Sequence, residues 1–322
     1  MLYNLVPSQY SHIVLALGIV LAYVITWLDL HHFMPRLPKD HGKALAVDGK
    51  VSEGKSTGAG VIFVAVFALC ALLFAPVDTE RIIYIVLLLI TRWTGFLDDA
   101  SRTPWGRMVK GLLDLLIAAL TAVAFLYFHE PKLHLAIFDV DLMLPVWLYA
   151  LLIVALIWGS INVTNCSDGV DGLSATLTII TLFSFYVVMH RLGTGDGFLL
   201  EIPVFVAVLL AYLWFNAPPS TALMGDAGSR SMGYYIALCA LMSGSPILFV
   251  LLALVLIIDG GLGLFKITVI RLTGRKDFMH KLKTPFHDHV RHNLGWTGPQ
   301  LVLRFAEIQL FVTIFTLALI GA

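Results

Sequence analysis

The sequence contains few charged residues and few cysteines. Asp, Glu, Lys and Arg make up only 13% of its 322 residues and the formal net charge is zero, whereas a soluble domain carries roughly 25% charged residues. This scarcity excludes a soluble two-domain protein. No internal repeat, low-complexity tract or nucleic-acid-binding signature is present. The three cysteines, Cys70, Cys166 and Cys239, are scattered without a CxxC spacing, so neither a disulfide framework nor a zinc site is expected.

Long apolar runs dominate the chain instead. Hydrophobic residues make up 59% of it, and the mean hydropathy is +0.88. Runs approaching the roughly 20 residues of one membrane span occupy about 12–30, 58–77, 80–97, 109–128, 144–164, 172–190, 199–215, 231–270 and 299–320. The run 231–270 is too long for one span, and Gly244-Ser245-Pro246 predicts a break in it. We therefore expect a single all-α domain over 1–322, a polytopic membrane protein with about ten transmembrane helices.

The distribution of Lys and Arg predicts the orientation of this protein. These residues gather in three connections, namely 31–57, 102–110 and 271–291. The alternate connections hold one Lys or Arg each, namely 76–81, 130–144 and 191–203. The positive-inside rule places the basic set in the cytoplasm. An even number of spans then leaves both termini outside.

Five aspartates at the edges of the apolar runs are the candidate functional residues, namely Asp98, Asp99, Asp168, Asp171 and Asp226. A carboxylate at the bilayer centre costs at least roughly 2.5 kcal/mol, so such residues need a partner. A divalent cation that holds a phosphorylated substrate is the leading candidate. On the ten-span topology all five lie on the cytoplasmic side, which predicts an active-site cleft at that face.

The segment NVTNCSDGVDGL places four polar residues at a spacing of three, namely Asn162, Asn165, Asp168 and Asp171. On a helix this spacing puts them along one face, where they would point into the cleft. The alternative is a loop in which Asn and Asp serve as turn and cap residues.

Other polar segments also have two possible interpretations. Adjacent carboxylates at Asp98 and Asp99 either face a cation or cap the next helix. Lys110 either extends to the membrane interface or neutralises a phosphate. The segment MGDAGS, Met224–Ser229, suits a phosphate or its cation, although turn formation alone also explains it.

A histidine-rich segment, TPFHDHVRHNLGW, precedes the last apolar run. It holds His287, His289 and His292 together with Asp288 and Arg291. Zinc ligation lacks support because no cysteine or second regular cluster accompanies these histidines. A cytoplasmic loop that places His and Arg near phosphates is the favoured reading.

Together these motifs resemble the polyprenyl-phosphate N-acetylhexosamine-1-phosphate transferase superfamily, and most closely its phospho-N-acetylmuramoyl-pentapeptide transferase (MraY) family. The segments that carry the resemblance are GFLDD (Gly95–Asp99), NVTNCSDGVDGL (Asn162–Leu173), FNAPPSTALMGDAGS (Phe215–Ser229) and FKITVIRLTGRKDFMHKLKTPFHDHVRHNLGW (Phe265–Trp296). The family's three-histidine run reads His287-Asp288-His289 here. The resemblance covers most of the chain from Gly95 onward.

The resemblance implies a function and a set of site residues. It implies ten helices in the bacterial inner membrane, with the site facing the cytoplasm. It implies transfer of phospho-MurNAc-pentapeptide from UDP-MurNAc-pentapeptide to undecaprenyl phosphate, giving lipid I and UMP, with a requirement for Mg²⁺. The implied catalytic residues are Asp98, Asp99, Lys110, Asp168, Asp171 and His287.

We expect Asp226, together with Asp168 or Asp171, to hold Mg²⁺. Lys110 and His287 would neutralise phosphate, and Asp98 would orient the lipid phosphate or act as a base. The residues expected to contact substrate are Asn165, Asn216, Ser229, His289 and Arg291.

Three questions stay open at this stage. A sister transferase that uses UDP-GlcNAc or another UDP-HexNAc is the nearest alternative. A cation- or proton-coupled transporter would place carboxylates near mid-span in inverted repeats, and the sequence shows neither. Any of the many apolar faces could form a homodimer interface.

Overall fold

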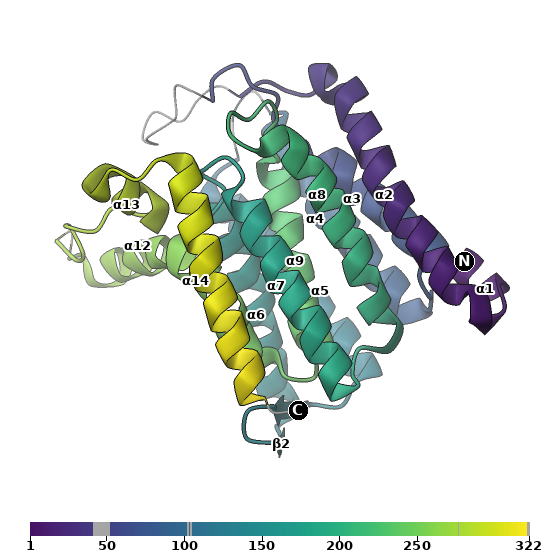
Figure 1. The fold of residues 1–322 in the computed structure, drawn as a ribbon. Helices are drawn as coiled ribbons and strands as arrows, with labels where there is room; N and C mark the ends of the chain where they lie inside the picture. Colours follow the sequence, from purple (N-terminus) through teal and green to yellow (C-terminus); the bar gives the residue numbers. More distant parts are fainter. Residues whose placement is uncertain (41–51, 102, 104, 276, 321–322) are drawn as a thin grey trace.

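The chain is built almost entirely from α-helices that lie side by side in a bundle (Figure 1). The computed structural model describes residues 1–40, 52–101, 103, 105–275 and 277–320. The stretch 41–51 of the basic N-terminal connection lies outside the described residues, as do Arg102, Pro104 and Lys276. The prediction of a mostly helical membrane protein is confirmed.

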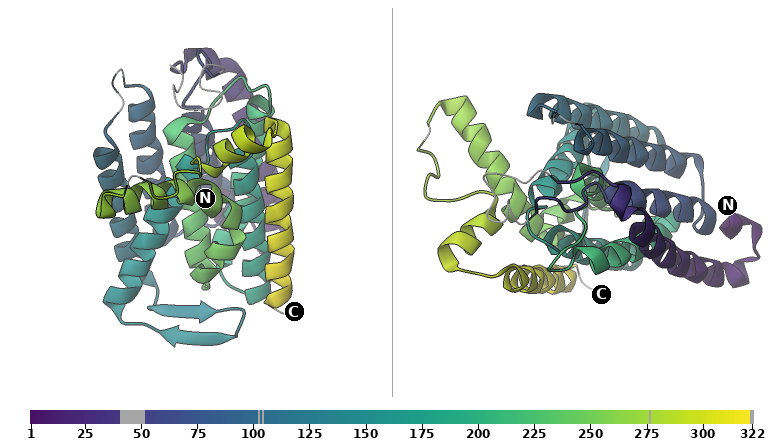
Figure 2. Two further views of the ribbon diagram at one scale, coloured as in Figure 1. Left: turned by 90° about the vertical axis from the view of Figure 1, so that its left-hand side faces the viewer. Right: turned by 90° about the horizontal axis from the view of Figure 1, so that it is seen from above.

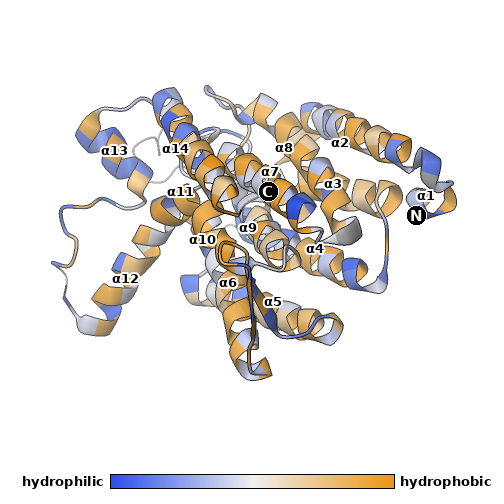
Figure 3. Cartoon of the chain, turned by 60° about the horizontal axis from the view of Figure 1, so that its bottom comes forward, coloured by the Kyte–Doolittle hydropathy of each residue, from blue (hydrophilic) through white to orange (hydrophobic). Residues whose placement is uncertain are grey.

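Within the described residues, six helical segments are long and apolar enough to cross a membrane. They are α2 (Ser11–Phe33) with the 3₁₀ turn η2 (Met34–Arg36), α5 (Arg107–Phe128), α6 (Val146–Cys166), α7 (Leu173–Leu192), α8 (Ile202–Asn216) with most of the 3₁₀ segment η3 (Asp196–Glu201), and α14 (Gly298–Leu319). Figure 3 shows hydrophobic residues along the outer helices of the bundle. This is the surface that a helical membrane protein presents to lipid.

Other helices of the bundle are shorter, more polar or bent. The apolar helix α3 (Gly60–Phe74) is short, and α4 (Thr79–Asp99) and α9 (Gly225–Met242) carry polar residues. A bent segment follows α9 and is described below. The count of ten spans requires all of these to cross the membrane, and it stays a prediction.

The long apolar run 231–270 breaks twice. Helix α9 ends at Met242, and the chain restarts in the 3₁₀ turn η4 (Pro246–Leu248), so the predicted break at Gly244-Ser245-Pro246 is confirmed. The second break was not predicted, and it bends the next segment by 71°. This segment comprises α10 (Phe249–Leu252), α11 (Leu254–Leu256), the π-helical turn η5 (Ile257–Gly261) and α12 (Leu262–Thr273).

Side chains from other helices stabilise the second break. The Gln309 side chain of α14 accepts a hydrogen bond from the Val255 N–H at 2.9 Å and donates to the Leu252 carbonyl at 2.9 Å. The Thr181 hydroxyl also donates to the Leu252 carbonyl, at 2.9 Å. These bonds replace the helical bonds lost at the bend, as buried backbone groups require.

The segment after the bend leaves the bundle. Figure 2 shows α12 and α13 (Phe286–Leu294) on one side of the other helices. A hairpin of β1 (Lys132–Leu135) and β2 (Val140–Met143) lies at one end of the molecule, and the short α1 (Leu2–Leu5) and η1 (Ser8–Tyr10) precede α2. The two strands pair antiparallel, with Lys132 opposite Met143.

Helix α9 occupies the centre of the bundle, and nearly all of its residues are buried (Figure 1). It packs chiefly against α4 and α6. Two glycines permit a close approach of backbones at its first turn. A Cβ on Gly95 would lie 2.6 Å from the Ala227 nitrogen, and a Cβ on Gly60 would collide with the backbone of Gly228. The start of α9 is thereby held at one end of the bundle.

Candidate active site

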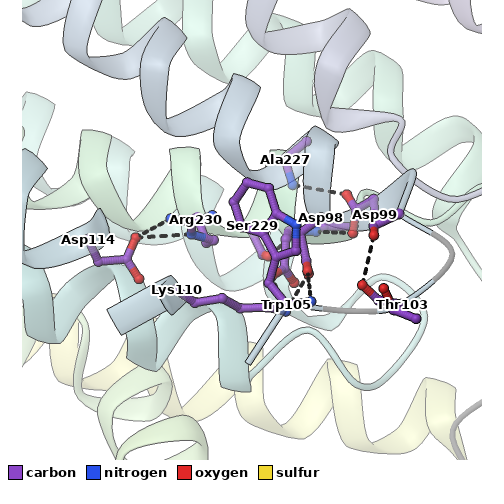
Figure 4. Close-up of polar contacts among 12 residues, drawn as sticks. Asp98, Asp99, Thr103, Trp105, Lys110, Asp114, Ala227, Ser229 and Arg230 are labelled. Atoms are coloured by element: carbon purple, nitrogen blue, oxygen red, sulfur yellow. Dashed lines mark hydrogen bonds and ion pairs between the residues drawn. The ribbon is translucent and has the colours of Figure 1, made fainter. Parts of the chain in front are cut away.

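Three aspartates from two helices meet at the end of the bundle where α4 ends and α9 begins. Carboxylate oxygens of Asp98, Asp99 and Asp226 all lie within 4.8 Å of one another. Lys110, in the first turn of α5, forms an ion pair with Asp98 and another with Asp226, the latter at 3.0 Å. Figure 4 shows the lysine beside Asp98, with Asp99 close by. Three clustered carboxylates repel one another, and the ammonium group of Lys110 offsets part of their charge.

The two adjacent aspartates have different partners. Asp99 accepts hydrogen bonds from the backbone N–H groups of Asp226 at 3.0 Å and Ala227 at 3.2 Å. It therefore caps the N-terminus of α9 from a neighbouring helix, where a carboxylate is favoured by the helix dipole. Asp98 is nearly buried and accepts a bond from the Trp105 N–H at 2.6 Å. The capping alternative thus applies to Asp99, although the helix it caps is α9 and not the next one.

A buried ion pair lies one turn deeper in the bundle. The Arg230 guanidinium of α9 donates from Nε to Asp114 Oδ1 of α5 at 3.0 Å, and from Nη2 to the same oxygen. The two side chains are only 1% and 3% exposed. Sequence reasoning missed this pair, because each residue stands alone in an apolar or small-residue context.

The predicted polar ridge of the NVTNCSDGVDGL segment is only partly helical. Helix α6 ends at Cys166, so Asn162 and Asn165 lie on the helix while Asp168 and Asp171 lie in the following turn. Asn162 donates to the Trp158 carbonyl at 2.8 Å, whereas Asn165 lies close enough to Asp226 to interact with it. The helical-face prediction is therefore wrong beyond Cys166. The Asp and Gly residues end the helix there.

Asp171 belongs to a second polar group beside the aspartate cluster. It pairs with Lys55 of the N-terminal connection at 3.3 Å and accepts a bond from the Ser220 N–H at 3.2 Å. Lys55 also donates to the Ser220 hydroxyl at 2.9 Å. Asp168, in the same turn as Asp171, lies close enough to the buried Tyr212 to interact electrostatically. Among the described residues, the geometry groups Asp226 with Asp98 and Asp99, and not with Asp168 or Asp171.

Two of the residues predicted to contact substrate have side chains that are hydrogen-bonded to backbone groups. Asn216 is buried, accepts from the Gly172 N–H at 2.9 Å and donates to the Ala222 carbonyl at 2.8 Å. These bonds join the turn after α6 to the loop after α8. Ser229 is also buried and donates to the Gly225 carbonyl at 3.0 Å. Both residues shape the loops of the site, and their contact with substrate stays a prediction.

His287 is held by a carboxylate that sequence reasoning missed. Asp259, in the π-helical turn, accepts bonds from the His287 backbone N–H at 2.7 Å and lies 2.9 Å from its Nδ1. Burial alone would lower the pKa of His287, but the Asp259 carboxylate outweighs it and raises that pKa above its usual value. The opposite ring edge, at Nε2, packs on Gly169 of the turn that holds Asp168 and Asp171.

His289 and Arg291 of the histidine-rich segment are less buried than His287. His289 stacks on Phe286 with ring centroids 5.8 Å apart, and its Nδ1 accepts from the Lys283 N–H at 3.3 Å. Arg291 lies one turn after His287 and interacts with it electrostatically. A lone aspartate before two glycines in the run VLIIDGGLGLF is the signal that could have identified Asp259.

Comparisons with known proteins place the chain in a family. The glycosyl transferase family 4 model matches residues 81–244. The chain is 38% identical to the phospho-N-acetylmuramoyl-pentapeptide-transferase of Treponema pallidum, over 86% of this chain and 81% of that protein. The proteins of the same name from Symbiobacterium thermophilum and Geobacillus are 31% and 27% identical, over 82% and 92% of this chain and 82% and 95% of their own lengths. The chain therefore belongs to glycosyl transferase family 4 and to the phospho-N-acetylmuramoyl-pentapeptide-transferase family.

Proposed function

We propose that this chain transfers phospho-MurNAc-pentapeptide from UDP-MurNAc-pentapeptide to undecaprenyl phosphate, giving lipid I and UMP. The names of its relatives support the identity of the transferred group. The observation that carries the chemistry is the cluster of Asp98, Asp99 and Asp226 with Lys110. Phosphoryl transfer depends mainly on positioning and on neutralising phosphate charge, and this cluster supplies groups suited to both.

The donor set fits Mg²⁺. Magnesium prefers oxygen ligands and commonly binds through one or two carboxylates with water and phosphate completing its shell. Asp226, with the Asp98–Asp99 pair beside it, would hold the ion. When bound, Mg²⁺ would shield the pyrophosphate charge and orient the phosphoryl group. Asp168 and Asp171 then remain as candidate catalytic residues in the turn that packs against His287.

The remaining charged groups have roles that follow from their positions. Lys110 already contacts two carboxylates of the cluster and would neutralise a phosphate that enters there. His287, whose charged form is favoured by its contact with Asp259, would serve the same purpose from the side of the Asp168–Asp171 turn. Asp98 would orient the lipid phosphate or accept its proton.

The orientation in the membrane is part of the proposal. We place the site at the cytoplasmic face of the bacterial inner membrane, with ten spans and both termini outside. The described part of the basic connection after η2 and the basic segment around α13 lie toward the end of the bundle that holds the site. Both chain ends lie away from it (Figure 1). This asymmetry of charge agrees with the positive-inside rule.

A direct comparison of two UDP-sugar donors tests the substrate. Purified protein in detergent or nanodiscs is supplied with a polyprenyl phosphate and radiolabelled UDP-MurNAc-pentapeptide or UDP-GlcNAc. We expect UMP and labelled lipid product only from the first donor, and only with Mg²⁺ present. Turnover of UDP-GlcNAc alone would replace the proposed substrate by another UDP-HexNAc within the same reaction class.

Asp226→Asn tests the site. Removing this charge from the cluster should reduce Mg²⁺-dependent UMP release by about 100- to 1,000-fold, the usual effect of losing one preorganised electrostatic group. The matched control is Asp141→Asn in the hairpin, a carboxylate that is 48% exposed at the other end of the molecule. Full activity of Asp226→Asn would remove Asp226 from the mechanism.

A further inference from the structure

We infer that the buried Asp114–Arg230 ion pair is a positioning device that fixes the register of α5 against α9 and thereby holds Lys110 on the aspartate cluster. This inference rests on the proposed function of the cluster. Asp114 and Arg230 are positioning residues, because they act through Lys110 and Asp226. Figure 4 shows the pair beside Lys110.

The two helices carry matched charges in opposite order. Lys110 and Asp114 are one turn apart on α5, and Asp226 and Arg230 are one turn apart on α9, so each couple shares a helix face. Both helices begin at the site end of the bundle. In the observed register Lys110 meets Asp226 at 3.0 Å and Asp114 meets Arg230 at 3.0 Å.

A shift of α5 along α9 by one helical turn would bring like charges together. Moving α5 by one turn in one direction sets Lys110 against Arg230, and moving it in the other direction sets Asp114 against Asp226. Either arrangement places two like charges against each other at the helix interface, which is unfavourable. A polar contact at an otherwise apolar helix interface is a known means of specifying register.

Polar side chains join α5 directly to α9. Helix α5 packs chiefly against α6 and α4. Among the described residues, its polar contacts with α9 are the two charge pairs and the Thr121 hydroxyl, which donates to Tyr234 Oη at 3.3 Å. The charge pairs therefore place Lys110 opposite Asp226 on α9.

The geometry of the pair argues against a role in stability alone. Arg230 Nε and Nη2 both donate to the same oxygen of Asp114, and the buried Arg230 Nη1 has no hydrogen-bond partner among the residues that the structure describes. A buried ion pair with incomplete hydrogen bonding is commonly no more stabilising than two apolar side chains of similar volume. Its distinctive contribution is the placement of charge.

The double variant Asp114→Leu/Arg230→Met separates positioning from stability. It removes both charges and keeps most of the side-chain volume, so we expect the thermal midpoint in detergent to stay close to that of the parent protein. We expect kcat for UMP release to fall by about 10- to 100-fold, the effect of a misplaced reacting group. KM for the UDP substrate should change much less.

A second measurement follows Lys110 without relying on activity. The Lys110 side chain is 27% exposed and engaged by two carboxylates, so it should be acetylated slowly in the parent protein. In the double variant its acetylation, measured by peptide mass spectrometry, should be several-fold faster. Arg230→Lys keeps the positive charge but loses the planar guanidinium group with its several N–H donors. It should give an intermediate kcat and an intermediate labelling rate.

The matched control removes another largely buried pair, at the far end of α4 from the site. Arg81 Nε and Glu201 lie 3.9 Å apart, with side chains 11% and 3% exposed, near the start of α4. Arg81→Met/Glu201→Leu should leave kcat and Lys110 labelling unchanged.

The outcomes distinguish the inference from the proposed function. Parent-like kcat and parent-like Lys110 labelling in the folded double variant would overturn the inference. If that variant does not fold, parent-like values in Arg230→Lys would overturn it equally. A parent protein that releases no UMP refutes the proposed substrate, while the labelling rates still decide the role of the pair.

Discussion

At the scale of single residues, the Asp98–Asp99 pair shows how adjacent carboxylates take different tasks. Successive residues on a helix point about 100° apart, so the two side chains reach different neighbours. Asp99 faces the start of α9 and binds its amides, whereas Asp98 faces α5 and pairs with Lys110. The pair thus joins three helices at one point, which explains why a single aspartate would not suffice.

The His287–Asp259 contact predicts the pH dependence of activity. The raised pKa of His287 keeps its ring charged to a pH above the usual value of 6.5. The stabilisation from this contact is therefore complete below the usual value, and it is lost as the pH rises through the folded-state pKa. If charged His287 neutralises phosphate, kcat falls on the alkaline side as the ring deprotonates.

Asp259→Asn should move that alkaline fall to lower pH. The variant removes the carboxylate that stabilises the charged ring, and burial then lowers the pKa of His287. The measurement is kcat for UMP release against pH. Asp277→Asn, in the exposed loop before α13, is the control and should not change the dependence of kcat on pH. An unshifted profile in Asp259→Asn would show that another group controls it.

At the scale of elements, the bent segment between α9 and α13 places Asp259 beside His287. Gly260 packs directly on α6, because a Cβ there would collide with the Val163 carbonyl. The Ser167 hydroxyl adds a bond to the Leu256 carbonyl at 3.3 Å. The end of α6, which leads into the Asp168–Asp171 turn, is therefore fixed against the π-helical turn.

The neighbouring glycines give a matched pair of substitutions. Gly260→Ala forces α6 and the π-helical turn apart and should destabilise the protein by about 1–3 kcal/mol, the usual cost of overpacking. At Gly261 a Cβ would meet side-chain atoms only at 3.5 Å or more, so Gly261→Ala should be neutral or slightly stabilising. Thermal midpoints in detergent report the difference. Equal midpoints would mean that the close approach at Gly260 is not a constraint.

Sequence patterns predicted one break of this run and missed the other for a physical reason. The break at Gly244-Ser245-Pro246 is local, because Gly244 adopts a φ of +73° and proline lacks an N–H. The bend near Ala253 depends on Gln309 and Thr181, which lie far away in sequence. Tertiary hydrogen bonds of this kind leave no local signature.

At the scale of the whole molecule, the site combines segments from most of the chain. Sequence patterns drew attention to the aspartates, because charged residues beside apolar runs are conspicuous. The family resemblance added the expected roles of Lys110 and His287. The same patterns could not pair Asp114 with Arg230, or Asp259 with His287, since each pairing depends on how helices pack. Residues with a functional motif were therefore predictable, and their positioning partners were not.

The orientation of the whole molecule can be measured by cysteine labelling. Cys70 and Cys239 are buried, so Cys166→Ser gives a suitable background. Phe138 in the hairpin connection is 73% exposed, and Leu294 at the end of α13 is 60% exposed. A membrane-impermeant maleimide applied to intact spheroplasts should label Phe138→Cys, and should label Leu294→Cys only after permeabilisation. The reverse pattern would place the aspartate cluster outside the cell, where UDP-linked substrates are not made, and would contradict the proposed topology.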